Sequence, residues 1–484
     1  MMSSSAILRT SANRKAFREA FYAAAKLKGE TFTHNTAYFI QGGDIKHRTN
    51  NNDVELSFRQ ESNFYYLSGC SEPGCALLMN PSISESVLFV PQYDDDYALW
   101  CGDYPVADDY KQKLGFSRVE YKSESAVASI LKEWKIQKVY AFDQESKNSS
   151  LLNPKTLEPG VEIISDEISR TFYVLVKDLR LIKTQEEIEI MRRMCQISGA
   201  AHVKCMQRAR PGINERELEA VFRYETMLNG GSIFQAYDPI IAGDDRGATL
   251  HYIRNDEIVH DGSLVLIDAG AETYGSLYAS DITRVFPVNG KFSEKQRQIY
   301  QLVLDAQMQV LASMKPGVKW EDMHRLALRV MTKGLYELGI LKVDGKQGDE
   351  AVEELVKHHA GSVFFPHGLG HALGLDVHDP PNRDGTFEKI DEPGIKNLRI
   401  RVTLQKGMVL TVEPGLYFNK RMIANALKDE TLQKYLNPSV INDYMSVGGI
   451  RIEDDVAVTD DGIDNLCAGI PKTIEEVEKV MSKQ

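Results

Sequence analysis

The stretch DGSLVLIDAG, residues 261–270, decides the fold because the chain repeats its pattern in KGMVLTVEPG, residues 406–415. In each stretch a glycine precedes a short apolar run, and a carboxylate stands six residues after that glycine. The two carboxylates are Asp268 and Glu413. Each one therefore closes an apolar run that we expect to form a buried strand.

A second pair of strands extends this repeat. SDITRVFPVNG, residues 280–290, places Asp281 nine residues before a glycine, and IEDDVAVTDDG, residues 452–462, places Glu453 at the same spacing. Acidic residues are common at strand ends, which would account for one such residue. Four carboxylates in paired register instead indicate a functional site.

Helical segments also occur in duplicate. RPGINEREL, residues 210–218, resembles KPGVKWEDM, residues 315–323, and an amphipathic stretch follows each of them. The duplication predicts a pseudo-twofold arrangement of two half-units. We therefore expect an α/β (α+β) fold in which the four acidic strand ends meet at one site.

The length and composition allow more than one domain. The chain has 484 residues, of which 43% are hydrophobic, enough for a large buried core. Thr184 and Glu187 form a capping-box pattern ahead of a long helical stretch. Upstream of it, strand-like and helical patterns alternate, at residues 86–90, 123–134 and 138–142. We predict an N-terminal α/β domain over residues 1–180 and a catalytic domain over residues 181–484.

The charge and the absence of long apolar segments restrict the partners. A net charge of -12 argues against nucleic acid and anionic membranes, and no segment approaches the ~20 apolar residues of a membrane span. The start, residues 1–17, lacks the apolar core of a secretory signal, so we expect a frayed terminus of a cytoplasmic protein. Because it is rich in Ser and Arg, organellar targeting is the alternative. The six scattered cysteines indicate reduced thiols.

Histidines gather in PHGLGHALGLDVHD, residues 366–379. His367 and His371 are four residues apart, as in an H-E-x-x-H zinc site, but the glutamate of that motif is missing. Four carboxylates and one imidazole can instead hold two divalent cations, and the imidazole favours Mn²⁺, Co²⁺ or Zn²⁺ over Ca²⁺. The charges of four carboxylates and two such ions cancel. A hydroxide between the two ions would be the nucleophile.

Four motifs, in order and spacing, resemble those of the pita-bread metallopeptidases, a family that includes methionine aminopeptidase, aminopeptidase P, creatinase and prolidase. The motifs are IDAG with ASDITR (267–284), HGLGHALGLDVHD (367–379), LTVEPG (410–415) and GGIRIEDDV (448–456). FRQESNFYYLSGCSEPGC, residues 58–75, resembles the N-terminal domain of prolidases and aminopeptidases P. The resemblance implies a C-terminal pita-bread fold preceded by an N-terminal α/β domain of the creatinase and prolidase type.

The resemblance also implies roles for single residues. Five side chains would hold two divalent metal ions, Mn²⁺ with Co²⁺ or Zn²⁺ as alternatives: Asp268 on one ion, Asp281 and Glu453 bridging both, and His371 and Glu413 on the other. Glu413 would also move protons, and His367 would line the site. His251 and His378 would contact the substrate and the tetrahedral intermediate. Tyr237 is a further candidate for substrate binding.

One spacing departs from that of the family. The two aspartates are usually eleven residues apart, whereas Asp268 and Asp281 are thirteen apart. Two extra residues preserve strand parity, so both side chains can still face one side if the connection is a longer hairpin. We therefore expect the ligands to carry over and the shape of the local loop to differ.

The substrate that we expect is an Xaa-Pro dipeptide, as for prolidase; the alternative is an aminopeptidase P that acts on longer Xaa-Pro peptides. A dipeptidase must recognise the carboxylate directly after the proline, which calls for an arginine. Arg399 lies fourteen residues before Glu413 and matches prolidase in kind and position. Arg451, two residues before Glu453, is a second candidate, and Arg401 is the reserve.

Two other classes of protein are alternatives for this sequence. A pita-bread module that only binds would have lost metal ligands, and a creatinase-like hydrolase works without two metals, so the full ligand set counts against both.

Trp100 matches a tryptophan that, in this family, reaches across a dimer interface and shortens the substrate pocket. It predicts a homodimer, and an ordinary buried tryptophan is the alternative.

Overall fold

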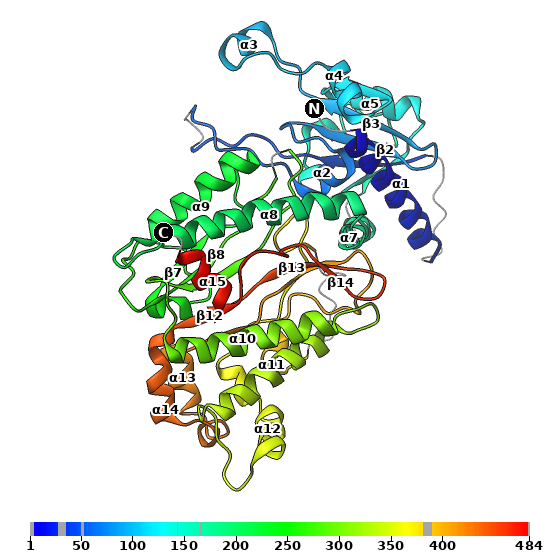
Figure 1. Cartoon of the computed structure of the whole chain (residues 1–484). Helices are drawn as coiled ribbons and strands as arrows, with labels where there is room; N and C mark the ends of the chain where they lie inside the picture. The colour runs from blue at the N-terminus through cyan, green and yellow to red at the C-terminus, as the bar shows by residue number, and fades with distance from the viewer. Residues whose placement is uncertain are drawn as a thin grey trace. The chain divides into compact units, whose positions relative to one another are not determined.

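The computed structural model of the chain describes residues 4–27, 35–49, 53–142, 144–164, 167–273, 275–380 and 390–482. Its contacts divide the chain into two compact units, Met1–Arg180 and Leu181–Gln484, whose elements are labelled in Figure 1. The architecture is mixed α/β, as predicted. None of the described helices is long and apolar enough to cross a membrane.

The first unit is built on a mixed sheet with the strand order β4-β3-β2-β1-β5-β6. The pairs β1–β2 and β2–β3 are antiparallel, whereas β3–β4, β1–β5 and β5–β6 are parallel. The runs predicted at 86–90 and 138–142 both form strands of this sheet. The strands are Thr36–Gln41 (β1), Ala76–Asn80 (β2), Glu85–Val90 (β3), Arg118–Tyr121 (β4), Lys138–Ala141 (β5) and Glu162–Ile164 (β6).

Helices cover this sheet. The helix Glu124–Glu133 (α5) begins at Ser123, whose side chain accepts a hydrogen bond from the Ala126 amide, as the capping pattern predicted. The helix Ser4–Leu27 (α1) buries Phe17 and Phe21, so the prediction of a frayed N-terminus is wrong. The other helices are Ser62–Ser68 (α2), Asp95–Cys101 (α3), Ala107–Leu114 (α4), Gln144–Lys147 (α6) and Glu167–Leu181 (α7), with the 3₁₀ turn Ser150–Leu152.

The second unit repeats one pattern twice, a packed pair of helices followed by antiparallel strands, which confirms the predicted duplication. The helices α8 and α9 precede the sheet β7-β8-β9, and α10 and α11 precede β10-β13-β14. In Figure 1 the strands lie between the two helix pairs. The bounds are Gln185–Arg208 (α8), Glu215–Gly230 (α9), Ile240–Gly243 (β7), Leu264–Asp268 (β8), Thr283–Pro287 (β9), Glu294–Ser313 (α10), Trp320–Glu337 (α11), Val409–Val412 (β10), Asp454–Val458 (β13) and Ile463–Asn465 (β14).

Shorter elements complete the second unit. A two-stranded antiparallel ribbon, Gly415–Tyr417 (β11) with Gly449–Arg451 (β12), follows the second half-unit's first strand. The expected capping box is present, because Thr184 and Glu187 each bond the other's backbone amide at the start of α8. The remaining helices are Gly348–Lys357 (α12), Lys420–Ala426 (α13), Pro438–Tyr444 (α14) and Ile474–Met481 (α15), with 3₁₀ turns at Asp244–Ala248, Ala360–Val363, Ile395–Asn397, Gln433–Tyr435 and Met445–Val447.

His324 of helix α11 is buried in the core of the second unit. Its ring stacks on Phe365 with 5.0 Å between the centroids. Neither ring nitrogen has a hydrogen-bond partner within the described part of the chain. Burial lowers the pKa of His324 to about 4, because the charged imidazolium cannot be solvated there. The folded protein therefore keeps this ring neutral at pH values where the unfolded chain protonates it.

This difference predicts a pH-dependent loss of stability that a phenylalanine would remove. The unfolded chain binds a proton at His324 below its ordinary pKa of about 6.5, so the native state loses stability as the pH falls from there toward 4. In His324→Phe, the free energy of unfolding should exceed that of the parent increasingly over this range, by roughly 3 kcal/mol at pH 4. Urea unfolding at several pH values measures this difference, with the exposed His260→Gln as control. A constant offset between His324→Phe and the parent would contradict the prediction.

Candidate metal centre

One cavity of about 680 Å³ in the second unit gathers nearly all of the predicted site residues. Its lining includes Tyr237, His251, Asp268, Asp281, His367, His371, His378, Arg399, Glu413, Arg451 and Glu453. Trp100 is the exception, since it belongs to helix α3 of the first unit. Trp100 is 84% exposed there, so the alternative of an ordinary buried tryptophan is wrong. Arg401, the reserve candidate, instead donates to the carbonyl oxygens of Ile395 and Lys396.

Three predicted ligands form the tightest group in this cavity. Asp281, His371 and Glu453 are all buried, and each offers a ligand atom within 4.8 Å of the others. His371 Nε2 lies 3.3 Å from Asp281 Oδ2. On the other side of the ring, His371 Nδ1 lies 3.0 Å from the Ala372 carbonyl oxygen, which can only accept a hydrogen bond. Nδ1 therefore carries the proton, and Nε2 presents its lone pair to the carboxylates.

His371 reaches this position because its loop runs beside strand β10. The Thr411 amide donates to the His371 carbonyl, and the Glu413 amide donates to the Leu369 carbonyl. The loop comes so close that a Cβ on Gly370 would lie 2.0 Å from the Thr411 carbonyl oxygen. Gly370, the second glycine of HGLGH, thus has a steric function. The close approach brings His371 Nε2 within 3.7 Å of Glu413 Oε1.

A second close approach sets the two aspartates. Strands β8 and β9 pair with Asp268 opposite Thr283, and the connecting segment returns past Gly270. A Cβ on Gly270 would lie 1.8 Å from the Ser280 carbonyl oxygen, directly before Asp281. With their positions thirteen residues apart, both aspartates still line one cavity. Tyr274, within the two-residue insertion region, lies outside the described residues.

Asp268 is held by protein partners at both of its oxygens. The Tyr237 hydroxyl lies 2.6 Å from Asp268 Oδ1 and 2.5 Å from Asp281 Oδ1, so it donates its single proton to either aspartate. Arg451 pairs with Asp268 Oδ2 and also donates to the Tyr417 hydroxyl and to Thr283 Oγ1. The Arg451 guanidinium is buried and engaged in the wall of the site, which suits a positioning role better than direct capture of a substrate.

The carboxylate of Glu413 faces two histidines. Oε1 lies toward His371, and Oε2 lies 4.0 Å from His367 Nδ1. His367 donates from Nδ1 to the Gly368 carbonyl oxygen, and its Nε2 lies 2.8 Å from the Tyr417 hydroxyl. His378 packs edge-on to His371 with 4.5 Å between ring centroids. His367 is thus a neighbour of the tight group, and His371 is the histidine within it.

Burial and mutual repulsion make this group unfavourable for carboxylates alone. Burial raises the pKa of Asp281, Glu413 and Glu453 well above the ordinary range, and neighbouring carboxylates add to the effect at each. Divalent cations would offset the cost of burial and the repulsion between the carboxylates, because they neutralise the negative charge and occupy the lone pairs. Oxygen donors with one imidazole also match the ligand chemistry of Mn²⁺ or Zn²⁺. The residues therefore fit a metal centre.

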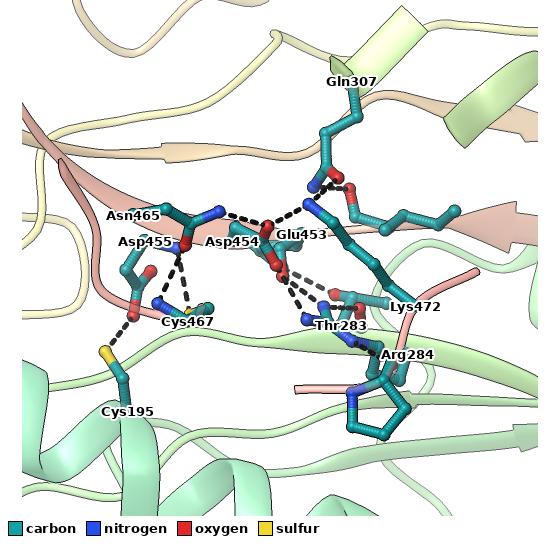
Figure 2. Close-up of polar contacts among 12 residues, drawn as sticks. Cys195, Thr283, Arg284, Gln307, Glu453, Asp454, Asp455, Asn465, Cys467 and Lys472 are labelled. Carbon is teal, nitrogen blue, oxygen red and sulfur yellow. Dashed lines mark hydrogen bonds and ion pairs between the residues drawn. The ribbon is translucent and has the colours of Figure 1, made fainter. Parts of the chain in front are cut away.

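Other residues of the site were not singled out from the sequence, although Thr283, Arg284 and Asp454 lie within its motifs. Thr283 Oγ1 donates to Glu453 Oε2 at 2.6 Å, and Arg284 forms a fully buried ion pair with Asp454 at 2.7 Å, as Figure 2 shows. Strand parity could have identified Thr283, which stands two residues after Asp281 on the same face. The Tyr417 contacts depend on the pairing of β11 with β12, which no local pattern predicts.

Comparison with known proteins gives two family matches. Residues 189–460 match Metallopeptidase family M24, and residues 11–140 match Aminopeptidase P, N-terminal domain. The chain is 37% identical over 448 residues to the Xaa-Pro dipeptidase of Homo sapiens, covering 92% of this chain and 88% of that protein. It is 41% identical over 441 residues to the protein named Probable Xaa-Pro aminopeptidase PEPP of Ajellomyces dermatitidis, covering 89% of each.

A solved structure extends the comparison to the fold. The proline aminopeptidase P II from Yersinia pestis superposes with a TM-score of 0.79 at 31% identity, covering 100% of both chains. These similarities confirm the predicted pita-bread fold and the N-terminal domain of the aminopeptidase P type. The named relatives divide between dipeptidases and aminopeptidases, so they leave the length of the substrate open.

The glycine contacts predict that Gly270→Ala disturbs the centre through the backbone. The added Cβ would overlap the Ser280 carbonyl, which must move and take Asp281 with it. We expect a loss of about 1–3 kcal/mol in the free energy of unfolding and weaker metal binding. Gly462→Ala is the matched control, because nothing lies within 4 Å of a Cβ at that position. Urea unfolding and metal content measure the two effects, and equal behaviour of the two variants would contradict the steric argument.

Proposed function

The chain belongs to metallopeptidase family M24 and is an Xaa-Pro peptidase; within that class we propose that it hydrolyses Xaa-Pro dipeptides with two bound divalent ions, Mn²⁺ being the best match. The observation that carries this proposal is the cavity itself. The tight group of Asp281, His371 and Glu453 and the guanidinium of Arg399 line the same space. A metal centre and a receptor for a carboxylate would then act on one small substrate.

The five carboxylate and imidazole ligands predicted from the motifs would hold the ions. When bound, the two ions would supply Lewis acidity and an activated water for amide hydrolysis. Glu413 would shuttle the proton on Oε2, the oxygen that faces His367, while Oε1 stays toward His371. His251 and His378, whose side chains are exposed to the cavity, would contact the substrate around the scissile bond.

Arg399 supports a preference for dipeptides. It follows the 3₁₀ turn Ile395–Asn397, its side chain is exposed, and within the described residues no carboxylate pairs with it. Arg451, by contrast, is buried against Asp268 and Tyr417. An unpaired guanidinium in the cavity wall can accept the terminal carboxylate of a dipeptide, whereas a longer peptide offers a neutral amide at that point.

The alternative is an aminopeptidase P activity on longer Xaa-Pro peptides. It is favoured by the 41% identity to the fungal protein named as a probable Xaa-Pro aminopeptidase. The metal centre would be common to both activities, because an Xaa-Pro bond is the same restricted tertiary amide in a dipeptide and in a longer peptide. The two functions therefore differ in how the cavity treats the atoms after proline.

We also propose that the chain works as a homodimer in the cytoplasm. The exposed Trp100 has Leu99 beside it, 76% exposed, so helix α3 presents an apolar surface of the kind that subunit contacts cover. All six cysteines are free thiols, which fits a reducing compartment.

Removal of a proposed bridging ligand should empty the centre. Glu453→Gln keeps the shape of the side chain and its contact with Thr283 but removes one negative charge from the buried group. We expect the bound Mn²⁺ to fall from two ions to one or none per chain, and turnover to fall by at least about a hundredfold, since several kcal/mol of charge stabilisation depend on the ions. Elemental analysis after gel filtration gives the metal content. Glu337→Gln on the exposed face of α11 is the control, and full metal loading of Glu453→Gln would refute the assignment.

Loss of Arg399 should remove the preference for dipeptides. A charge-assisted hydrogen bond of this kind is worth about 1.5–3 kcal/mol, so Arg399→Ala should lower kcat/KM on Ala-Pro by about ten- to a hundredfold. Activity on Ala-Pro amide or an Xaa-Pro tripeptide should change far less. Arg399→Lys should recover part of the loss, because an ammonium cannot reproduce a bidentate grip.

Arg401→Ala serves as the control, because that guanidinium already bonds backbone carbonyls. Two results would replace the dipeptidase by the aminopeptidase: a parent enzyme that prefers the tripeptide, or an Arg399→Ala variant that loses both activities equally.

The dimer proposal has its own test. Trp100→Ala and Leu99→Ala each remove an exposed apolar side chain from α3, so both should shift the sedimentation equilibrium toward the monomer. Ile83→Ala, which removes another exposed apolar side chain from the first unit, should leave the equilibrium unchanged. A parent chain that sediments as a monomer at micromolar concentration would end the proposal.

A further inference from the structure

A second group of potential ligands lies directly behind the candidate metal centre. Cys195 comes from helix α8, Asp455 from strand β13, and Cys467 follows strand β14, as Figure 2 shows. All three side chains are buried, and each offers a ligand atom within 4.8 Å of the others. This group of two thiols and one carboxylate is separate from the oxygen-rich set in the cavity.

Hydrogen bonds tie the three residues to each other and to the centre. The Cys195 thiol donates to Asp455 Oδ2 at 3.1 Å, and the Asp455 amide donates to Cys467 Sγ at 3.3 Å. The backbone amide of Asp281 donates to the same Asp455 Oδ2 at 2.9 Å. The Asp455 carboxylate thus connects the thiol pair with a candidate bridging ligand.

The Asp455 carboxylate is incompletely satisfied where it stands. Its Oδ1 atom is buried and has no hydrogen-bond partner within the described part of the chain. Among the described residues no cation pairs with Asp455, whereas the adjacent Asp454 is paired with both Arg284 and Lys472. A buried carboxylate that lacks a counter-charge and leaves one oxygen unused is unfavourable. The free oxygen and the two thiols are ligand types that a soft divalent cation can use.

We propose that Cys195, Asp455 and Cys467 form a binding site for one soft divalent cation of the Zn²⁺ and Cd²⁺ class. Thiolates select such ions over Mn²⁺ and Mg²⁺, which prefer oxygen. A tetrahedral ion at the usual Zn–S distance of about 2.3 Å holds its ligand atoms about 4 Å apart, so atoms already within 4.8 Å need only small shifts. Binding forms two metal–sulfur bonds and one metal–oxygen bond, and the two thiol protons leave to solvent.

The site is coupled to the candidate centre through Asp281. An ion bound through Asp455 Oδ1 polarises the same carboxylate whose Oδ2 accepts from the Asp281 amide, so its binding alters the support of that residue. The proposal does not depend on the dipeptidase assignment, because the centre in the cavity contains no thiol. A signal from metal bound to sulfur therefore does not come from that centre, whatever the substrate proves to be.

The test is a Cd²⁺ titration of the full chain loaded with Mn²⁺, followed through the ultraviolet charge-transfer band of cadmium bound to thiolate. Cys70 and Cys75 of the first unit have sulfur atoms only 3.6 Å apart and could also bind Cd²⁺. Both are therefore changed to alanine in the parent for all measurements. We expect a band that saturates at one Cd²⁺ per chain by elemental analysis and that Zn²⁺ abolishes by competition.

Variants then assign the band. Cys195→Ala and Cys467→Ala should each abolish it, and Asp455→Asn should weaken Cd²⁺ binding by at least about tenfold, because even the loss of an outer-shell partner costs that much. Cys205→Ala, a buried cysteine whose thiol donates to the Leu218 carbonyl, should keep the band. Glu453→Gln should keep it as well, which separates this site from the centre in the cavity.

Two results would overturn the proposal: no thiolate band in the folded parent at saturating Cd²⁺, or a band that persists in Cys195→Ala and Cys467→Ala. If an alanine variant does not fold, the titration of the parent still tests the proposal, because a folded parent without a thiolate band would overturn it. Cys195→Ser and Cys467→Ser, which keep the size and polarity of the side chains, provide the second pair of variants.

Discussion

Two carboxylates of like charge, Asp281 and Glu453, are held side by side out of water, and much of the second unit serves to keep them there. Burial alone disfavours each charge, and the neighbour makes it worse. Polar partners offset part of this cost, since Tyr237 reaches Asp281 and Thr283 reaches Glu453. The remaining negative charge is what makes the site a receptor for cations.

Backbone geometry, more than side-chain chemistry, brings the ligands together. In each half-unit a glycine allows a loop to approach a strand more closely than any side chain would permit, at Gly270 and at Gly370. The two approaches stand at different positions of the repeat, and each places one candidate ligand, Asp281 or His371, in the wall of the cavity. The two half-units thus bring candidate ligands from loops and from strand ends into one cavity.

The candidate metal ligands and Arg399, which we propose to select the substrate, belong to different kinds of segment in the cavity wall. The candidate metal ligands belong to strands and to loops that are bonded to strands, which fixes their positions. Arg399 belongs to an irregular segment after a 3₁₀ turn and is not paired with a described carboxylate. A change in such a segment can alter which peptides fit while the strands and the ligands remain in place. On the proposed function, this separation would let relatives named as dipeptidases and as aminopeptidases share one fold.

The sequence by itself determined the duplication, the strand that ends at Asp268 and its counterpart before Glu413, because these follow from local periodicity. The choice of His371 among the histidines came from the resemblance of its motif to that of a known family. The prediction of a frayed N-terminus was wrong, because the burial of Phe17 and Phe21 depends on contacts with Tyr38 of strand β1. Only the tertiary structure decided that Tyr237 links two aspartates, that Arg451 is already engaged, and that Asp455 stands between a thiol pair and Asp281. Each of these contacts joins residues far apart in the chain, and their distances depend on how the two half-units pack, which no local pattern encodes.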